Sequence, residues 1–147
     1  MFTGIVTEIG TVTFTAPSSA GRTMQIEAPA TTAGLIVGES VAVDGVCLTA
    51  VAVGGSRFTV DVVHETLQRT TLGTLAAGSP VDLERPMAAA GRYDGHIVQG
   101  HVDGVGTVLA VEDEGGSRRM RIAMPPALAR YVVEKGSVTV DGVSLTV

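Results

Sequence analysis

The sequence contains no tryptophan, and aromatic residues make up only 3% of its 147 positions. It also has no apolar run near the roughly 18 residues of a membrane-spanning helix. The first ten residues, MFTGIVTEIG, lack the basic and then apolar order of a signal peptide. We therefore expect a cytoplasmic protein without a membrane partner.

Cysteine occurs once, as Cys47, which excludes an intrachain disulfide and a cysteine-based zinc site. The thiol is then either a small apolar core residue or a reactive group. The net charge is −5, and the few basic residues are dispersed, which argues against nucleic acid as a partner. No cluster of metal-ligating residues stands out, so we expect no metal site.

The most informative feature is an internal repeat. Residues 41–49 read VAVDGVCLT and residues 138–146 read VTVDGVSLT, so seven of nine positions are identical at an offset of 97. At an offset of 96, GIVTEIGTV at residues 4–12 aligns with GHVDGVGTV at residues 100–108. Repetition of this kind indicates two copies of one structural unit. The second copy stops early, so we expect a fragment of a longer protein.

Short alternating segments separated by turn signals predict strands, and 19 glycines suit tight turns. We expect an all-β protein built from tandem six-stranded, antiparallel, Greek-key-like barrels, the second of them incomplete. Residues 1–95 form the predicted N-terminal barrel domain and residues 96–147 the partial C-terminal one. The predicted strands of the first unit cover residues 1–14, 22–28, 40–43, 46–53, 56–63 and 78–83, with helical segments at 31–37 and 64–72.

Candidate catalytic residues are found at equivalent positions of the two copies where the side chains differ in chemical reactivity. Cys47 aligns with Ser144, and Ile5 aligns with His101. A thiol and a hydroxyl at equivalent positions suggest two similar pockets with different polar contacts. Taken alone, Cys47 is more often a buried apolar residue, and a lone histidine is more often structural than catalytic. His96 and His101 are five apart, a poor spacing for a metal pair on a strand, although one of them is a candidate acid or base.

Two further polar features have a simple structural alternative. Residues 61–66 combine a carboxylate, an imidazole and a hydroxyl at the end of an apolar strand, but Glu65 near a helix start is also favourable on its own. Lys135 precedes a glycine and is ordinarily a solvated charge.

Several phrases together resemble the riboflavin synthases of the alpha-chain type. They are MFTGIV at the N-terminus, VDGVCLT, ETLQRTTLG at residues 65–73, GHIVQGHVDG at residues 95–104, and DGVSLT near the end. The resemblance covers all 147 residues. Members of this family have two complete barrels and a C-terminal helix that joins three subunits, so this chain resembles a C-terminally truncated member.

The resemblance implies a dismutation without cofactor, in which two molecules of 6,7-dimethyl-8-ribityllumazine give riboflavin and 5-amino-6-ribitylaminouracil. It implies a homotrimer when the chain is full length, with lumazine synthase as a candidate partner. Carried onto this sequence, it assigns catalytic roles to Cys47, His101 and Ser144. The implied pocket residues are Gly4, Ile5, Val6, Cys47, Leu48, Thr49, Asp61, Val62, Val63, His64, Glu65 and Thr66 for the first unit, and Gly100, His101, Val102, Lys135, Ser144, Leu145 and Thr146 for the second.

Two other functions stay open at this point. Lumazine proteins share the double barrel and hold a lumazine or flavin without catalysis, but they depart from the catalytic pattern. Cys47, His101 and Ser144 are all present here, which favours the enzyme. A non-enzymatic scaffold leaves the differences between the two copies unexplained.

Overall fold

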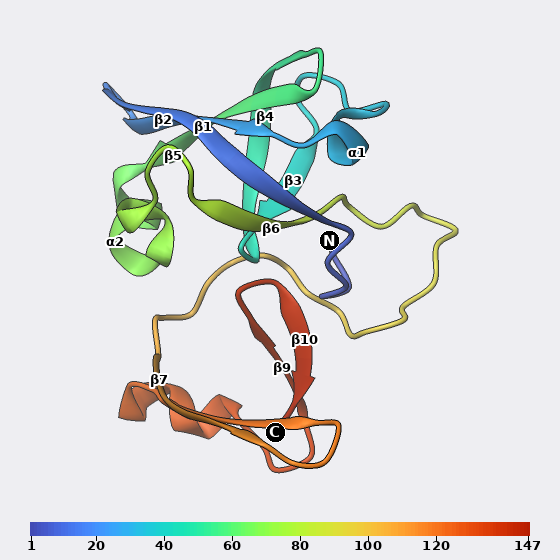
Figure 1. Ribbon diagram of the computed structural model, residues 1–147, viewed down its shortest axis with the longest axis vertical. Helices are drawn as coiled ribbons and strands as arrows, with labels where there is room; N and C mark the ends of the chain where they lie inside the picture. Colours follow the sequence, from blue (N-terminus) through green and yellow to red (C-terminus); the bar gives the residue numbers. More distant parts are fainter.

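The computed structural model describes residues 1–147 and contains one closed antiparallel barrel of six strands (Figure 1). The strand order around the barrel is β1-β2-β5-β4-β3-β6. Closure removes every unpaired strand edge. The all-β prediction is therefore confirmed, with a second, partial unit beside the barrel. The barrel strands are β1 (Glu8–Ser18), β2 (Gly21–Glu27), β3 (Ser40–Val43), β4 (Val46–Gly54), β5 (Arg57–Val63) and β6 (Pro80–Glu84).

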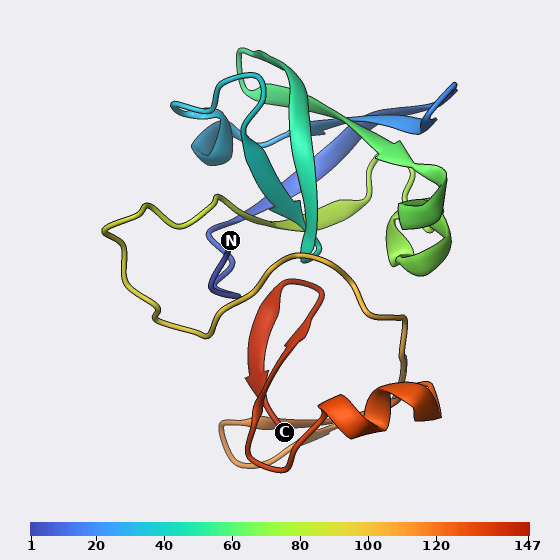
Figure 2. The same ribbon diagram turned by 180° about the vertical axis from the view of Figure 1, so that it is seen from behind.

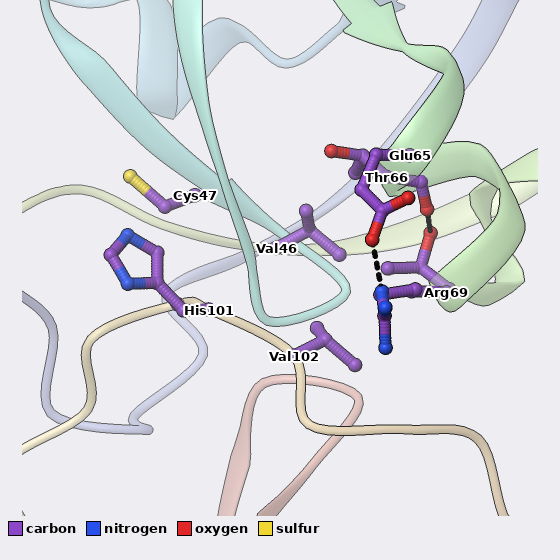
Figure 3. A pocket seen from close by; sticks show the side chains of 9 residues that line it. Val46, Cys47, Glu65, Thr66, Arg69, His101 and Val102 are labelled. Carbon is purple, nitrogen blue, oxygen red and sulfur yellow. Dashed lines mark hydrogen bonds and ion pairs between the residues drawn. The ribbon is translucent and has the colours of Figure 1, made fainter.

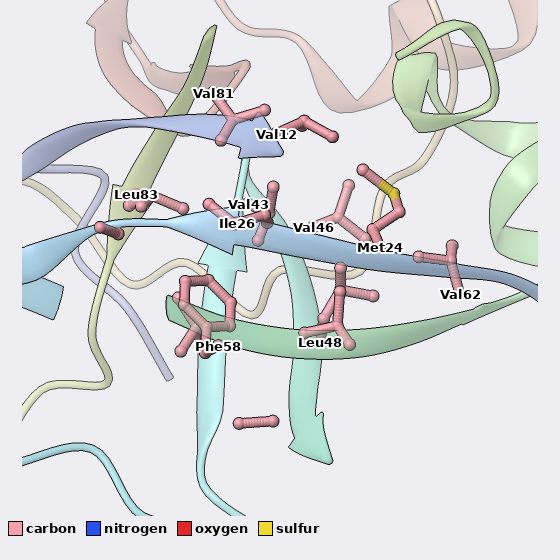
Figure 4. Packing of buried hydrophobic residues seen from close by; sticks show 14 of the residues in the cluster. Val12, Met24, Ile26, Val43, Val46, Leu48, Phe58, Val62, Val81 and Leu83 are labelled. Atoms are coloured by element: carbon pink, nitrogen blue, oxygen red, sulfur yellow. The ribbon is translucent and has the colours of Figure 1, made fainter. Parts of the chain in front are cut away.

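The barrel interior is filled by one apolar cluster of 16 buried residues (Figure 4). Strand β5 shows how the sequence builds it, because Phe58, Val60 and Val62 are at most 1% exposed while the residues between them face outward or lie half-buried. This period of two is the pattern of a strand with one buried face. The β3–β4 hairpin turns at Asp44 and Gly45, whose φ angles of 46° and 77° fit a tight turn of the primed type.

The helices are short: α1 (Pro29–Thr32), α2 (His64–Arg69), η1 (Thr71–Thr74) and η2 (Pro126–Tyr131). The helical segment predicted at residues 31–37 is wrong in extent, since α1 ends at Thr32 and Gly34 takes a φ of 79° that no right-handed helix continues through. The helix predicted at residues 64–72 likewise divides into α2 and η1. None of these helices is long and apolar enough to cross a membrane.

The second unit consists of two separate hairpins, β7–β8 and β9–β10, below the barrel in Figure 1. In the first unit β5 joins β2 to β4, and β6 joins β3 to β1. The chain carries no counterpart of these two joining strands. Val108 is accordingly 54% exposed, whereas its equivalent Val12 is fully buried. The strands are β7 (Thr107–Asp113), β8 (Arg118–Ala123), β9 (Ser137–Val140) and β10 (Val143–Thr146).

The two units correspond closely in detail. Strand β9 lies 97 residues after β3 at both ends, and Asp141 repeats the positive φ of Asp44, at 45°. Pairing shifts register between Val12 and Phe14 in β1 and at the equivalent place in β7. The duplication read from the sequence is therefore also present in the backbone.

The first strand begins later than the sequence predicted. We expected a strand from residue 1, but β1 starts at Glu8. The preceding residues leave the barrel, and Phe2 forms an isolated antiparallel bridge with Val98 of the second unit. The linker between the two units, residues 88–95, loops away from both of them, as the view from behind shows (Figure 2). In the second unit the first strand likewise begins late, because β7 starts only at Thr107.

Candidate functional site

A cleft of about 190 Å³ opens where the β3–β4 hairpin meets the second unit (Figure 3). Strand β4 and helix α2 line it from the barrel side, and residues 100–102 of the second unit line it from the other side. Cys47 and His101 lie on one flank of the cleft, and the ion pair of Glu65 with Arg69 lies on the other. The lining residues are Val46, Cys47, Glu65, Thr66, Arg69, Thr70, Gly100, His101 and Val102.

The alternation of β4 explains why Cys47 faces this cleft. Val46 and Leu48 point into the barrel and are 4% and 6% exposed, so the residue between them points out of it. The Cys47 amide donates a hydrogen bond to the carbonyl oxygen of Gly100 at 2.9 Å. A side chain at Gly100 would place its Cβ 2.7 Å from the Cβ of Cys47. Only glycine therefore allows residues 100–102 to lie this close to the first unit.

The same arrangement occurs around Ser144 with the units exchanged. The Ser144 amide donates to the carbonyl oxygen of Gly4 at 2.7 Å, and a Cβ on Gly4 would lie 2.7 Å from the Cβ of Ser144. Phe2 and Val98 exchange two backbone hydrogen bonds of 2.7 and 3.0 Å between these segments. In each unit, the segment before the first strand thus packs against the hairpin of the other unit.

This exchange corrects the grouping expected from the sequence. We expected residues 4–6 beside Cys47 and residues 100–102 beside Ser144. The structure does the reverse, since Gly100 to Val102 line the Cys47 cleft and Gly4 contacts Ser144. The cause is local: the residues after Gly4 and Gly100 lead into β1 and β7, while the residues before them pair with each other across the unit boundary.

A buried carboxylate holds the N-terminal segment in its exchanged position. Glu84, at the end of β6, is only 6% exposed. It accepts hydrogen bonds from the amide and the hydroxyl of Thr3 at 2.6 and 2.7 Å, and from the amide of Gly4 at 2.9 Å. A buried carboxylate is stable only when its oxygens are satisfied in this way. The position of Gly4 against Ser144 therefore depends on Glu84.

His96, which the sequence offers with His101 as a candidate acid or base, lies beside Ser144. Its Nδ1 atom lies 2.7 Å from the Ser144 hydroxyl, and its Nε2 atom lies 3.0 Å from the Thr139 hydroxyl. The sequence feature that points to this place is that both hydroxyl partners of His96 replace residues without a hydroxyl in the first unit. Ser144 aligns with Cys47, and Thr139 aligns with Ala42.

Three carboxylates gather where the two hairpin turns meet. Asp44 accepts a hydrogen bond from the Asp82 amide at 2.7 Å. Burial, with nearby Asp141 and Asp82 adding negative charge, raises the pKa of Asp44 to about 6 from an ordinary 3.8. Burial and then Asp82 also raise the pKa of Asp141. The hairpins touch directly, because a Cβ on Gly45 would meet the Gly142 amide at 2.6 Å.

The remaining predicted residues are either buried in the barrel core, half-buried or exposed. Leu48 and Val62 are buried in the barrel core, so they support the cleft from inside without lining it. Val63, His64, Leu145 and Thr146 are exposed, as are Ile5 and Thr49. Asp61 accepts a hydrogen bond from Thr23 on β2, and Val6 is half-buried. Lys135 is exposed, and its amide donates to the carbonyl oxygen of Val147 at 2.8 Å.

Comparison with known proteins places these features in a family. The family described as lumazine binding domain matches residues 3–86 and 99–147. A riboflavin synthase of Mycobacterium tuberculosis is 51% identical over 148 residues, and one of Actinobacillus pleuropneumoniae is 46% identical over 147. The matches cover all of this chain, and 74% and 68% of those relatives.

Solved structures of LumP are similar over nearly the whole chain. The complex of LumP with riboflavin superposes with a TM-score of 0.89 at 25% identity, covering 99% of this chain and 79% of that one. The complex with 6,7-dimethyl-8-(1'-D-ribityl) lumazine gives a TM-score of 0.86. The arrangement of the two units is therefore shared with proteins that hold a lumazine or a flavin.

Proposed function

Because the chain belongs to the riboflavin synthase family and carries its lumazine binding domain, we propose that it converts 6,7-dimethyl-8-ribityllumazine to riboflavin. Two lumazine molecules exchange a four-carbon unit, and 5-amino-6-ribitylaminouracil is the second product. One observation carries the proposal: the chain builds two equivalent hairpins, each completed by a glycine segment of the other unit. A reaction between two identical molecules requires two such related sites.

The chemistry asks little of the protein beyond orientation and proton transfer. The methyl group on C7 of one lumazine loses a proton, and C7 of the other accepts a nucleophile. Holding two rings in register contributes on the order of 7 to 11 kcal/mol in favourable intramolecular reactions. Positioned acids and bases add about 10²- to 10⁴-fold. We assign the first cleft to one lumazine, with the Cys47 thiol and the His101 imidazole beside its ring.

Ser144 takes the equivalent place in the second unit. The assignment rests on its alignment with Cys47 and on its hydrogen bond to Gly4, which matches that of Cys47 to Gly100. We keep three further substrate-binding candidates there: Leu145 and Thr146 on β10, and Lys135 just before β9. On the first side we keep Glu65 and Thr66, which line the cleft, together with the neighbouring residues Asp61, Val63 and His64.

Four wider expectations belong to the same proposal. We propose a homotrimer for the full-length protein and a cytoplasmic location, with lumazine synthase as a candidate partner. We also propose that the boundary between the two domains lies at residue 95, within the linker. The small-molecule site itself is supported by the solved LumP complexes with riboflavin and with the lumazine.

A second candidate is lumazine binding without turnover, which the likeness to LumP favours. Sequence identity to this chain favours the enzyme, because LumP is 25% identical while the two riboflavin synthases are 46% and 51% identical. The test is to mix the purified chain with the lumazine and follow riboflavin absorbance. New flavin supports the enzyme, and a bound but unchanged lumazine spectrum supports the carrier. Absence of binding contradicts both.

A further inference from the structure

His96 is fixed at both ring nitrogens by side chains of the second unit. Nδ1 meets the Ser144 hydroxyl at 2.7 Å, Nε2 meets the Thr139 hydroxyl at 3.0 Å, and the His96 amide donates to the Thr3 carbonyl oxygen at 3.0 Å. The ring therefore has one orientation, between β9 and β10, with Ser144 at one end and Thr139 at the other.

The first unit has none of this network. At the positions equivalent to Ser144 and Thr139 it carries Cys47 and Ala42. Ala42 is buried with Phe2 and Val98 in a small apolar cluster, and Cys47 packs against it. The two units therefore share a backbone but differ in the two side chains that contact His96 in the second unit. Such a joint difference indicates different chemical roles for the two sites.

A hydroxyl hydrogen-bonded to an imidazole nitrogen is the arrangement that activates a serine as a proton acceptor. Neutral imidazole donates from one nitrogen and accepts at the other. If Nε2–H donates to Thr139, then Nδ1 accepts the proton of Ser144, and the free lone pairs of the serine oxygen are available to a ligand. A hydroxyl can donate or accept, so the contact with Thr139 fits either tautomer, and the Nε2–H form is the one in which Ser144 can pass its proton to His96.

We infer that His96 is the positioning residue of Ser144, held by Thr139 in the tautomer that lets Ser144 accept the methyl proton of the bound lumazine. The inference rests on the proposed function for its substrate. When that proton reaches Ser144 Oγ, the hydroxyl proton of Ser144 moves to His96 Nδ1. The imidazolium so formed keeps its Nε2–H on Thr139. Return of the proton to the product reverses both movements, so no oxidant or co-reactant is needed.

The tautomer is tested without turnover by ¹⁵N NMR of the histidine side chains in the intact chain. We expect Nδ1 of His96 to have the shift of an accepting nitrogen and Nε2 that of a protonated one. Thr139→Val removes the hydroxyl that selects the tautomer and should mix the two forms, whereas Thr139→Ser should restore the original spectrum. The opposite tautomer in the unaltered chain, or no response to Thr139→Val, overturns the inference even where riboflavin forms.

Steady-state kinetics supply the second test. We expect His96→Gln to lower kcat by about 10²-fold or more with little change in KM, the range for loss of general acid–base assistance. Ser144→Ala should lower kcat equally, and the double variant should be no worse than either, because groups that act as a unit are not additive. Ser137→Ala, on the exposed side of β9, is the matched control.

The outcomes separate the two proposals. An unaltered chain that forms no riboflavin counts against the proposed function, and the NMR result still decides the positioning role. Losses that multiply in the double variant, or a His96→Gln effect confined to KM and stability, show a structural histidine and overturn the inference.

Discussion

The Cys47 amide and the Gly100 carbonyl oxygen are joined by a 2.9 Å hydrogen bond across the boundary between the two units. The Ser144 amide and the Gly4 carbonyl oxygen form the equivalent hydrogen bond with the two units exchanged. The cleft at Cys47 is therefore a joint product of both units, although Cys47 belongs to a barrel whose sheet closes without the second unit. Loss of the contact should affect the site before it affects the barrel.

Replacing Gly100 with alanine tests this contact. Its φ of 81° is strained for alanine, and the new Cβ would lie 2.7 Å from the Cβ of Cys47. Gly38→Ala is the matched control, because Gly38 has a φ of 93° with no atom within 4 Å. Both variants incur about 1–2 kcal/mol of backbone strain, but only Gly100→Ala adds a steric cost of about 1–3 kcal/mol.

We expect Gly100→Ala to weaken lumazine binding strongly, measured by titrating ligand fluorescence, and Gly38→Ala to leave it unchanged. Thermal unfolding of both variants provides the stability control. Equal binding by the two variants would show that the packing of residues 100–102 on Cys47 does not shape the cleft.

Glu84→Gln should destabilise the junction between the units. The carboxylate is buried and accepts three hydrogen bonds from Thr3 and Gly4. An amide replaces one accepting oxygen with a donor, which leaves at least one buried N–H unpaired at a cost of about 1–3 kcal/mol. Urea unfolding measures the loss. Glu27→Gln removes only an exposed ion pair with Arg57 and should cost about 0–1 kcal/mol; equal losses would contradict the role of Glu84.

The sequence predicts the architecture well, for a physical reason. Hairpin strands depend on local alternation and on the Asp-Gly turns, both of which are readable along the chain, so residues 40–43 match β3 as predicted. The repeat offset also identifies Cys47 and Ser144 as equivalent positions. It cannot show which unit a segment joins, because exchange of residues 1–4 and 97–100 leaves every local pattern intact. Nor can it show that His96, a candidate acid or base, contacts Ser144 and Thr139, which lie 48 and 43 residues away along the chain.

The Asp44 carboxyl should make the protein more stable in mild acid. Its pKa rises from 3.8 to about 6 on folding, mainly through burial. The folded chain therefore binds a proton more tightly than the unfolded chain. Stability is greatest below about pH 4 for this group and falls as the pH rises through 6, where the folded carboxyl must ionise. Because Asp44 is only half-buried, the expected change is on the order of 1 kcal/mol.

Asp44→Asn provides the matched comparison for that pH dependence. Asparagine tolerates the positive φ of the turn, and its side-chain oxygen can still accept the hydrogen bond of the Asp82 amide. We expect urea unfolding between pH 4 and 7 to show a flatter profile in this variant. An unchanged slope would place the titration elsewhere, with Asp141 as the next group to replace, since burial raises its pKa as well.

The single thiol of Cys47 offers a direct test of where the ligand binds. Cys47 is half-buried and lines the cleft, so a bound ring beside it should block small alkylating reagents. We expect the rate of iodoacetamide labelling, followed by intact mass, to fall in proportion to the free fraction of protein as lumazine is added. Ribitol lacks the ring system and should not protect, and Cys47→Ser should take up no label. Labelling at the same rate with and without saturating lumazine would place the ligand away from Cys47, and the equivalence of the Cys47 and Ser144 hairpins would then have no functional meaning.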